Sequence, residues 1–124
     1  MIFGIGTDII EVARIGEMAA RGRDYLETIF TEKEIEYCES KAKKAQHYAA
    51  RYAAKEAALK ALSVGWRDGL GFCEIEVLDN ERGQPQVCVH GKVKSLFEQL
   101  QIKQTSISLS HSKESAIAVV ILET

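Results

Sequence analysis

The chain has 124 residues, a mass of 13.8 kDa and a net charge of −2, from 16 Lys and Arg against 18 Asp and Glu. This length is typical of one domain, and 46% hydrophobic with 27% charged residues excludes a disordered or collagen-like chain. Because the charges nearly balance, the broad positive field of non-specific nucleic-acid binding is excluded, and we expect a single domain over residues 1–124 without a nucleic-acid partner.

The first half of the chain predicts one strand at residues 2–10 and then helical segments at 11–22, 25–30, 35–40 and 42–62. Gly4 and Gly6 indicate a strand whose backbone another element approaches closely. Thr31 and Glu34 form a capping box that starts the third helical segment. The alanine-rich run from 42 to 62 contains neither Gly nor Pro, and it predicts one long helix.

The second half predicts strands at 72–78 and 85–89, a helix from Gly91 to Leu100, and strands at 106–111 and 116–122. The turn NERGQ joins the first two strands into a hairpin, in which Pro85 is acceptable only at an edge or a strand start. Alternation in the next strand places Ile107, Leu109 and His111 on one face. The last strand is continuously apolar, which predicts a strand covered on both faces. This order of elements indicates an α+β domain, with the long helix packed on a mostly antiparallel sheet.

The three cysteines, Cys38, Cys73 and Cys88, form no CxxC pair, and their odd number argues against a disulfide framework and a structural zinc site. We interpret them as small buried side chains in a reducing compartment. No stretch reaches the roughly 18 uncharged apolar residues of a membrane span. The first residues are apolar, but they lack the basic flank of a signal peptide and are interrupted early by Asp8. The sequence therefore predicts a cytoplasmic protein without a membrane partner.

Charged residues in apolar segments are candidates for chemistry, because a buried charge requires a partner or a ligand. Asp8, in the first strand, is either a cap for the following helix or a metal ligand. Glu56 and Lys60 have the spacing of a solvated ion pair, but they also share one helical row with Tyr52. Since Mg²⁺ commonly takes only one or two protein carboxylates, Asp8 and Glu56 together suit a phosphate bound through magnesium.

A basic stripe follows the first strand and consists of Arg14, Met18, Arg21 and Arg23. Such a run is usually a solvated face. Arginines beside a methionine also suit an acidic protein helix, because charge steers the encounter and methionine packs adaptably. His111 is either a hydrogen-bonded histidine at the rim of the core or a contact for a phosphate.

Three blocks carry a resemblance to a known family: GIGTDIIEVARI at 4–15, RYAAKEAALKAL at 51–62 and SLSHSKESAIAVVI at 108–121. In order, spacing and chain length they resemble the holo-[acyl-carrier-protein] synthase family of phosphopantetheinyl transferases. The resemblance implies transfer of 4′-phosphopantetheine from coenzyme A to a serine of apo acyl carrier protein, in support of fatty acid biosynthesis. The second product is adenosine 3′,5′-bisphosphate. The resemblance also implies homotrimers with active sites between subunits and one Mg²⁺ per site.

By matching position, the resemblance implies that Asp8 and Glu56 bind the metal and that Lys60 contacts the transferred phosphate. As a separate mechanistic hypothesis, Glu56 accepts the proton of the carrier serine, either directly or through a metal-bound water. The implied contacts to the nucleotide are Arg51 and His111 at its phosphates, with Gly65 and Pro85 around the adenosine. The implied docking residues for the carrier are Arg14, Met18, Arg21 and Arg23.

Two other functions remain open at this stage. A non-catalytic module that binds acidic partners through the basic stripe gives no reason for Asp8 or Glu56. A metal-dependent phosphohydrolase acting on a small nucleotide uses the same carboxylates without any carrier.

Overall fold

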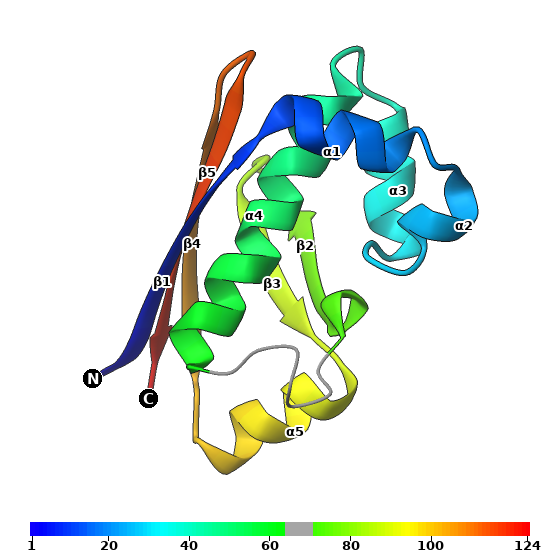
Figure 1. The fold of residues 1–124 in the computed structure, drawn as a ribbon. Coiled ribbons are helices and arrows are strands. Elements are labelled where there is room, and N and C mark those ends of the chain that lie inside the picture. Colours follow the sequence, from blue (N-terminus) through cyan, green and yellow to red (C-terminus); the bar gives the residue numbers. More distant parts are fainter. Residues whose placement is uncertain (64–70) are drawn as a thin grey trace.

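The computed structural model describes residues 1–63 and 71–124 of the chain (Figure 1). The elements are β1 (Ile2–Glu11), α1 (Val12–Ala19), α2 (Arg23–Leu26), α3 (Glu32–Glu39), α4 (Lys44–Leu62), β2 (Ile75–Asp79), β3 (Pro85–Val89), α5 (Gly91–Gln99), β4 (Gln104–His111) and β5 (Ser115–Glu123). A 3₁₀ turn at Phe72–Glu74 precedes β2. Pro85 is the first residue of β3, as predicted. Across these described ranges, no helix combines the length and apolarity needed to cross a membrane.

Two antiparallel sheets lie on either side of α4. The larger sheet has the order β1-β5-β4, and β2 with β3 forms a separate hairpin. Figure 1 shows α4 running along the three-stranded sheet, with the hairpin on its other side. The chain ends meet at one end of the sheet, where the Thr124 amide donates to the Met1 carbonyl oxygen at 2.9 Å. The predicted α+β architecture is confirmed.

Two glycines allow α4 to lie directly on β1. A Cβ atom on Gly6 would overlap the carbonyl oxygen of Ala57, and one on Gly4 would overlap that of Ala61. The close approach predicted from these glycines is therefore confirmed. Because side chains alternate along a strand, Asp8 lies on the same face of β1 as the glycines and is held beside α4.

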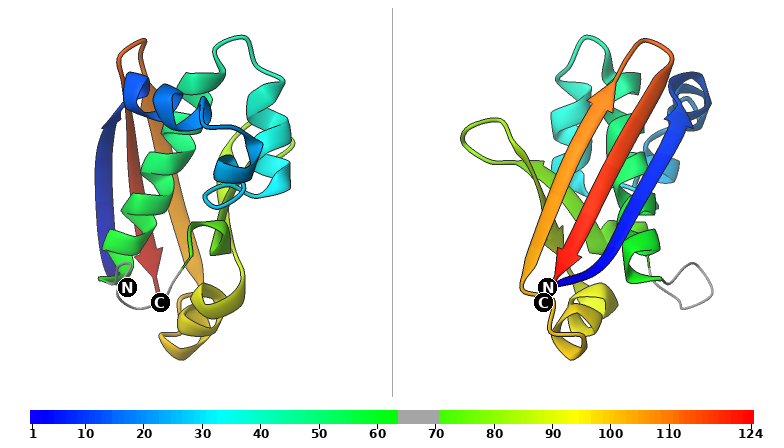
Figure 2. Two further views of the ribbon diagram at one scale, coloured as in Figure 1. Left: turned by 45° about the vertical axis from the view of Figure 1, so that its right-hand side comes forward. Right: turned by 90° about the vertical axis from the view of Figure 1, so that its left-hand side faces the viewer.

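None of the described helices or strands covers the outer face of the three-stranded sheet (Figure 2, right). Alternate residues of β5 are buried toward α4, whereas Ile117 on the outer face is 42% exposed. On β1, Ile5 and Ile9 are 63% and 65% exposed and pair with outward positions of β5. The prediction that the last strand is covered on both faces is thus wrong for this single chain, since none of the described elements covers the outer face.

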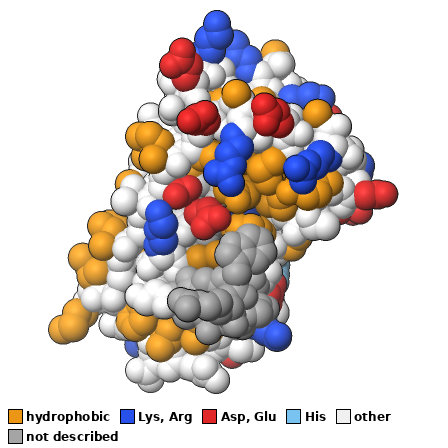
Figure 3. Space-filling view, in the orientation of Figure 1, with side chains coloured by type: hydrophobic (Ala, Val, Ile, Leu, Met, Phe, Trp, Pro, Cys, Tyr) orange, Lys and Arg blue, Asp and Glu red, His pale blue; other side chains and the backbone are white. Residues whose placement is uncertain are grey.

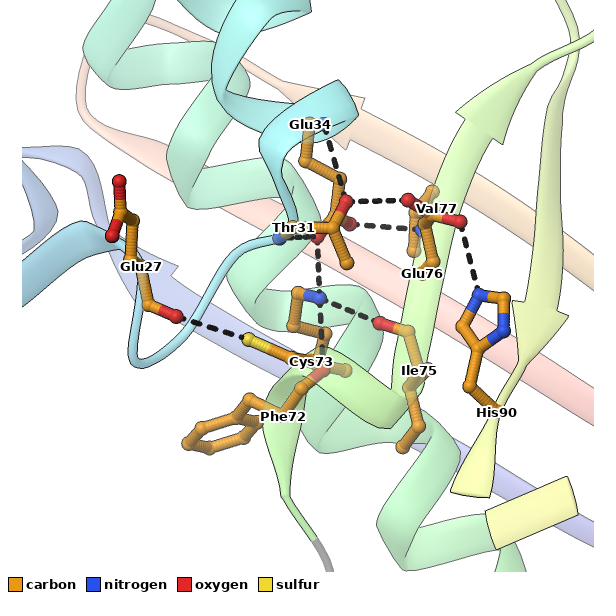
Figure 4. Close-up of polar contacts among 10 residues, drawn as sticks. Glu27, Thr31, Glu34, Phe72, Cys73, Ile75, Glu76, Val77 and His90 are labelled. Carbon is orange, nitrogen blue, oxygen red and sulfur yellow. Dashed lines mark hydrogen bonds and ion pairs between the residues drawn. The ribbon is translucent and has the colours of Figure 1, made fainter.

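A buried ion pair joins α3, α4 and β2. Lys55 Nζ contacts Glu34 Oε1 at 2.7 Å and donates to the carbonyl oxygens of Phe72 at 2.9 Å and Ile75 at 2.5 Å. The other Glu34 oxygen accepts the Val77 amide at 2.8 Å (Figure 4). Burial lowers the pKa of Lys55, and the Glu34 charge opposes that effect. The capping box predicted at the start of α3 is confirmed. Its glutamate, Glu34, also links α3 to α4 and β2 through the contacts with Lys55 and Val77.

The cysteines are free, but they differ in burial. Cys38 is buried, Cys73 is partly buried and Cys88 is exposed. The prediction of three buried cysteines is therefore wrong for Cys88. This residue lies on β3 in a two-stranded sheet, where alternate side chains point to solvent.

Candidate active site

Asp8, Glu56 and Lys60 meet at the seam between β1 and α4. Lys60 Nζ donates to Asp8 Oδ1 at 3.1 Å and to the Thr7 carbonyl oxygen at 3.0 Å. The Asp8 side chain is 17% exposed and that of Lys60 is 55% exposed. Burial raises the pKa of Glu56, and the nearby Asp8 charge raises it further, although Tyr52 and Lys60 act in the opposite direction. The three predicted residues therefore form one half-open charged cluster.

The two local explanations of these charges do not hold. The N-cap of α1 is Glu11, which makes no side-chain cap, and the Val12 amide instead donates to the Glu114 carbonyl oxygen at 2.9 Å. The alternative that Asp8 caps a helix is thus wrong. Lys60 forms its salt bridge with Asp8 on another element, rather than with Glu56 one helical turn away.

The donor set of this cluster fits Mg²⁺. Two carboxylates are within the number that magnesium usually takes from a protein, and water and phosphate oxygens complete its octahedron. The Lys60 ammonium already brings one positive charge to the pair. Within residues 1–63 and 71–124, no group of three or more His, Cys, Asp or Glu residues is placed to hold a metal, so the fit rests on Asp8 and Glu56.

A cavity of about 790 Å³ lies between α4, the β2–β3 hairpin and β4. Its lining includes three of the residues expected to contact the nucleotide, namely Arg51, Pro85 and His111. The Arg51 side chain is 3% exposed, with Nη2 3.5 Å from Asp79 Oδ1 and the guanidinium 4.0 Å from the centre of the Tyr37 ring. Its Nε is buried and has no hydrogen-bond partner within residues 1–63 and 71–124. The cavity therefore offers a buried cation with unused hydrogen-bonding capacity.

His111 lies at the rim of this cavity and is exposed. Its Nδ1 is 3.0 Å from Gln46 Oε1, so the ring is oriented by a hydrogen bond to α4. This agrees with both sequence interpretations, a hydrogen-bonded rim histidine and a residue available to a phosphate.

A single chain does not bring the two groups of predicted residues together. Asp8 is on β1 and His111 is on β4, which are opposite edges of the sheet with β5 between them. None of Asp8, Glu56 and Lys60 lines the cavity that contains Arg51. The position of Gly65 lies outside the described residues.

The predicted docking residues lie on and after α1. Arg14 and Met18 belong to α1, Arg21 follows it and Arg23 begins α2. The positive charge of Arg14 lowers the pKa of Glu56, so the basic stripe adjoins the carboxylate cluster. The Arg21 guanidinium lies 4.8 Å from the centre of the Tyr25 ring. Figure 3 shows basic side chains beside an apolar patch on this face.

Among the cavity residues that were not predicted from the sequence, Tyr37, His47 and Asp79 bring aromatic or titratable side chains close to Arg51. His47 precedes Arg51 by four residues on α4, so helical spacing was a usable signal for it. Tyr37 and Asp79 come from α3 and β2, and only the tertiary fold brings them to Arg51.

The family model of the 4′-phosphopantetheinyl transferase superfamily matches residues 4–120. The chain belongs to this superfamily. A holo-[acyl-carrier-protein] synthase of Geobacter sp. (strain M21) is 45% identical over 124 residues, which are 99% of each chain.

Solved structures of phosphopantetheinyl transferases agree with the fold. The holo-[acyl-carrier-protein] synthase of Neisseria meningitidis has a TM-score of 0.90 and 30% identity, over 100% of both chains. The synthase of Bacillus anthracis, in complex with CoA (3′,5′-ADP), has a TM-score of 0.81 and 36% identity, over 100% of this chain and 98% of that one. The family, the enzyme class and the fold implied by the three sequence blocks are confirmed.

Proposed function

We propose that this chain transfers 4′-phosphopantetheine from coenzyme A to a serine of apo acyl carrier protein and releases adenosine 3′,5′-bisphosphate. The observation that carries the proposal is the convergence of Asp8, Glu56 and Lys60 at one seam, in a member of the superfamily. The coenzyme A of the Bacillus anthracis structure and the names of the relatives supply the substrate and the acceptor. The three free thiols suit a cytoplasmic enzyme, and the acceptor suits a role in fatty acid biosynthesis.

Phosphoryl transfer needs positioning and charge neutralisation more than covalent help from the protein. Asp8 and Glu56 would hold Mg²⁺, which when bound stabilises the negative charge of the diphosphate. Lys60 exchanges its contact with Asp8 for the transferred phosphate and neutralises part of its charge. Its exposed, flexible side chain permits this movement.

The serine proton passes to the Glu56 carboxylate, whose pKa is raised by burial. The serine oxygen then forms a bond to the phosphorus that carries pantetheine. The phosphoanhydride bond breaks, and its electron pair leaves with adenosine 3′,5′-bisphosphate.

The carrier protein docks on the basic stripe of Arg14, Met18, Arg21 and Arg23. This surface lies next to Glu56, as the effect of Arg14 on the Glu56 pKa indicates. Docking there delivers the carrier serine to the carboxylate cluster. The contact depends on exposed charges and is therefore sensitive to salt.

We also infer that the working enzyme is a homotrimer with active sites between subunits. Coenzyme A contains a diphosphate, which would bind at the carboxylate cluster, and a nucleotide, which would bind in the Arg51 cavity. In one chain, however, these two places lie at opposite edges of the sheet. A second copy can supply the missing half. The open apolar face with Ile5, Ile9 and Ile117 supports association, because such patches on soluble proteins are typical of interfaces.

The decisive test is mass spectrometry of apo acyl carrier protein incubated with this protein, coenzyme A and Mg²⁺. A carrier that gains one phosphopantetheine supports the transferase. Consumption of coenzyme A with an unmodified carrier would identify a phosphohydrolase instead. No change in either molecule would leave only the non-catalytic binding module.

The role of Glu56 is tested with Glu56→Gln and the matched control Glu98→Gln, which changes an exposed glutamate on α5. We expect the first variant to lose turnover with the fold intact and the second to keep it. An active Glu56→Gln enzyme would refute the ligand and base assignment.

The assembly is tested by sedimentation and by mixing Glu56→Gln with His111→Ala. If sites form between subunits, each mixed trimer contains some sites with both residues intact, and part of the activity returns. A monomeric mass, or no recovery after the subunits exchange, contradicts the trimer.

A further inference from the structure

The cavity around Arg51 contains an imidazole that the proposed nucleotide contacts do not include. His47 lies on α4 one turn before Arg51 and is partly buried. Its ring meets the His111 ring at 61° with centroids 5.4 Å apart, and the Tyr37 ring at 77° with centroids 5.7 Å apart. Rings from α3, α4 and β4 therefore meet beside the buried guanidinium.

The same cavity has an unused donor. Arg51 Nε is buried and finds no hydrogen-bond partner in the described part of the chain, although buried polar groups in proteins are nearly always paired. The guanidinium is only 3% exposed, so bulk water does not satisfy it. An acceptor supplied by a ligand accounts for this donor.

Charge balance indicates that the ligand of this cavity is an anion whose negative charge Arg51 alone does not neutralise. On the proposed function, the diphosphate of coenzyme A lies at Asp8, Glu56 and Lys60, which leaves the 3′-phosphate for this cavity. A phosphate monoester carries about −1.5 to −2 charges near neutral pH. Asp79 already offsets the Arg51 charge at 3.5 Å. Further positive charge must therefore come from the cavity wall.

The His47 ring can supply that charge. Burial lowers the pKa of His47, and the positive charges of His111, Arg51 and Lys41 lower it further, while Asp79 opposes them. A bound anion acts in the opposite direction and raises the pKa of the His47 ring, so anion binding favours its protonated form. Groups that act on His47 come from every side: Lys41 before α4, Arg51 on α4, Asp79 on β2, His111 on β4 and the Tyr37 ring on α3.

Neither imidazole is fully engaged by the protein. Within the described residues His47 makes ring contacts but no hydrogen bond, and His111 uses only Nδ1, toward Gln46. Both rings line the same cavity. Each therefore retains a ring nitrogen available to a ligand in the cavity.

We propose that His47 is a further binding residue for the 3′-phosphate of coenzyme A and that, with Arg51 and His111, it distinguishes coenzyme A from its 3′-dephospho form. The proposal rests on the proposed function, because it takes coenzyme A as the substrate. It extends that function by naming a specificity-determining residue that lies outside the three sequence blocks of the resemblance.

The test measures dissociation constants for coenzyme A and 3′-dephospho-coenzyme A by calorimetry, at about pH 6 and about pH 8. The proteins are the wild type, His47→Phe and the control His90→Phe, whose exposed histidine contacts Glu76 outside the cavity. Phenylalanine preserves the ring contacts with Tyr37 and His111, and thermal unfolding verifies the fold. A second variant, His47→Gln, keeps a neutral donor.

The preference for coenzyme A is the ratio of the dissociation constant for 3′-dephospho-coenzyme A to that for coenzyme A. At about pH 6 we expect this ratio to be about tenfold smaller in His47→Phe than in the wild type, with the dissociation constant for 3′-dephospho-coenzyme A unchanged. At about pH 8 the difference from the wild type becomes small, because the imidazole is then neutral. Ionisation of the phosphate affects both proteins equally and cancels in this comparison. His47→Gln retains part of the preference with little dependence on pH, and His90→Phe behaves as the wild type.

Equal weakening of both ligands in His47→Phe would show a packing role and overturn the inference, as would an unchanged preference. The transfer assay separates the two proposals. Wild-type protein that prefers coenzyme A through His47 but modifies no carrier refutes only the proposed function. Protein that modifies the carrier with an unaltered preference in His47→Phe refutes only the inference.

Discussion

Lys60 Nζ lies 3.1 Å from Asp8 Oδ1, across the seam between α4 and β1. The lysine ammonium therefore contacts the same Asp8 carboxylate that would hold a divalent cation together with Glu56. Repulsion between the ammonium and the metal opposes binding of the metal, whereas the bound phosphate attracts both. Lys60 therefore acts in opposite directions on metal binding and on transfer.

Replacement of this residue separates the two effects. We expect Lys60→Met to bind Mg²⁺ about threefold more tightly, because one nearby positive charge is removed from a partly exposed site. The same variant should lose at least about tenfold in kcat, because the transferred phosphate loses a point charge. Magnesium titrations of binding and of rate provide the two measurements. A variant with unchanged kcat would contradict the assignment of Lys60 to the phosphate.

The basic stripe predicts a selective effect on the carrier. Arg14→Ala and Arg21→Ala should raise the KM for the carrier several-fold while the KM for coenzyme A changes little, and added salt should reduce the difference. Arg23 pairs with Glu27 at 3.1 Å, so Arg23→Ala is expected to have a smaller effect. Steady-state kinetics with each substrate varied in turn test this order. Equal effects on both substrates would place these arginines outside the docking surface.

The thiols predict a graded reactivity. Burial raises the pKa of Cys38 to about 12, whereas Cys88 is exposed and lines the Arg51 cavity. In native protein at about pH 8, iodoacetamide should modify Cys88 first and Cys38 only after unfolding. Adenosine 3′,5′-bisphosphate should slow modification of Cys88 by occupying the cavity. Peptide mass spectrometry follows each site, and an unprotected Cys88 would argue against nucleotide binding there.

Features that depend on local chemistry were predictable from the sequence. Gly4 and Gly6 indicated the close approach of α4, and Thr31 with Glu34 indicated the start of α3. Each signal involves only neighbouring residues and known backbone preferences. The convergence of Asp8 with Glu56 is different, because two carboxylates far apart in the chain have no spacing rule. The chemistry of Mg²⁺ suggested the pair and the family resemblance supported it, but neither could place the two side chains at one seam.

Features that depend on what meets what in three dimensions were not predictable. Arg51 and Asp79 come from α4 and β2, so their pairing follows from the fold alone. The open face of β5 is a second feature that the sequence could not predict. Continuous apolarity reports that both faces of a strand avoid water, but it does not reveal whether the cover comes from the same chain or from another copy.

The glycines predict opposite effects of the same substitution. Gly6→Ala should destabilise the protein by about 3 kcal/mol or more, because the new Cβ overlaps the Ala57 backbone and α4 must shift. Gly16→Ala should stabilise it by up to about 1 kcal/mol, because the nearest atom to the new Cβ is Ala45 Cβ at 3.8 Å and alanine favours the helix. Urea unfolding at equal protein concentration measures both. Similar midpoints for the two variants would contradict the close contact of α4 with β1.

The buried pair of Lys55 and Glu34 predicts a non-additive cycle. Lys55→Met should destabilise the protein by about 3–5 kcal/mol, because it removes the ammonium that balances the buried Glu34 charge and that donates to two backbone carbonyl oxygens. Adding Glu34→Gln should recover part of this loss, since a neutral amide is less unfavourable than an unpaired charge in the same place. The Lys44→Met variant is the control, since its ion pair with Glu39 is exposed and contributes at most about 1 kcal/mol. The measurement is the unfolding free energy of the wild type, of the two single variants and of the double variant. Strictly additive losses of stability would mean that Lys55 does not stabilise the buried charge of Glu34.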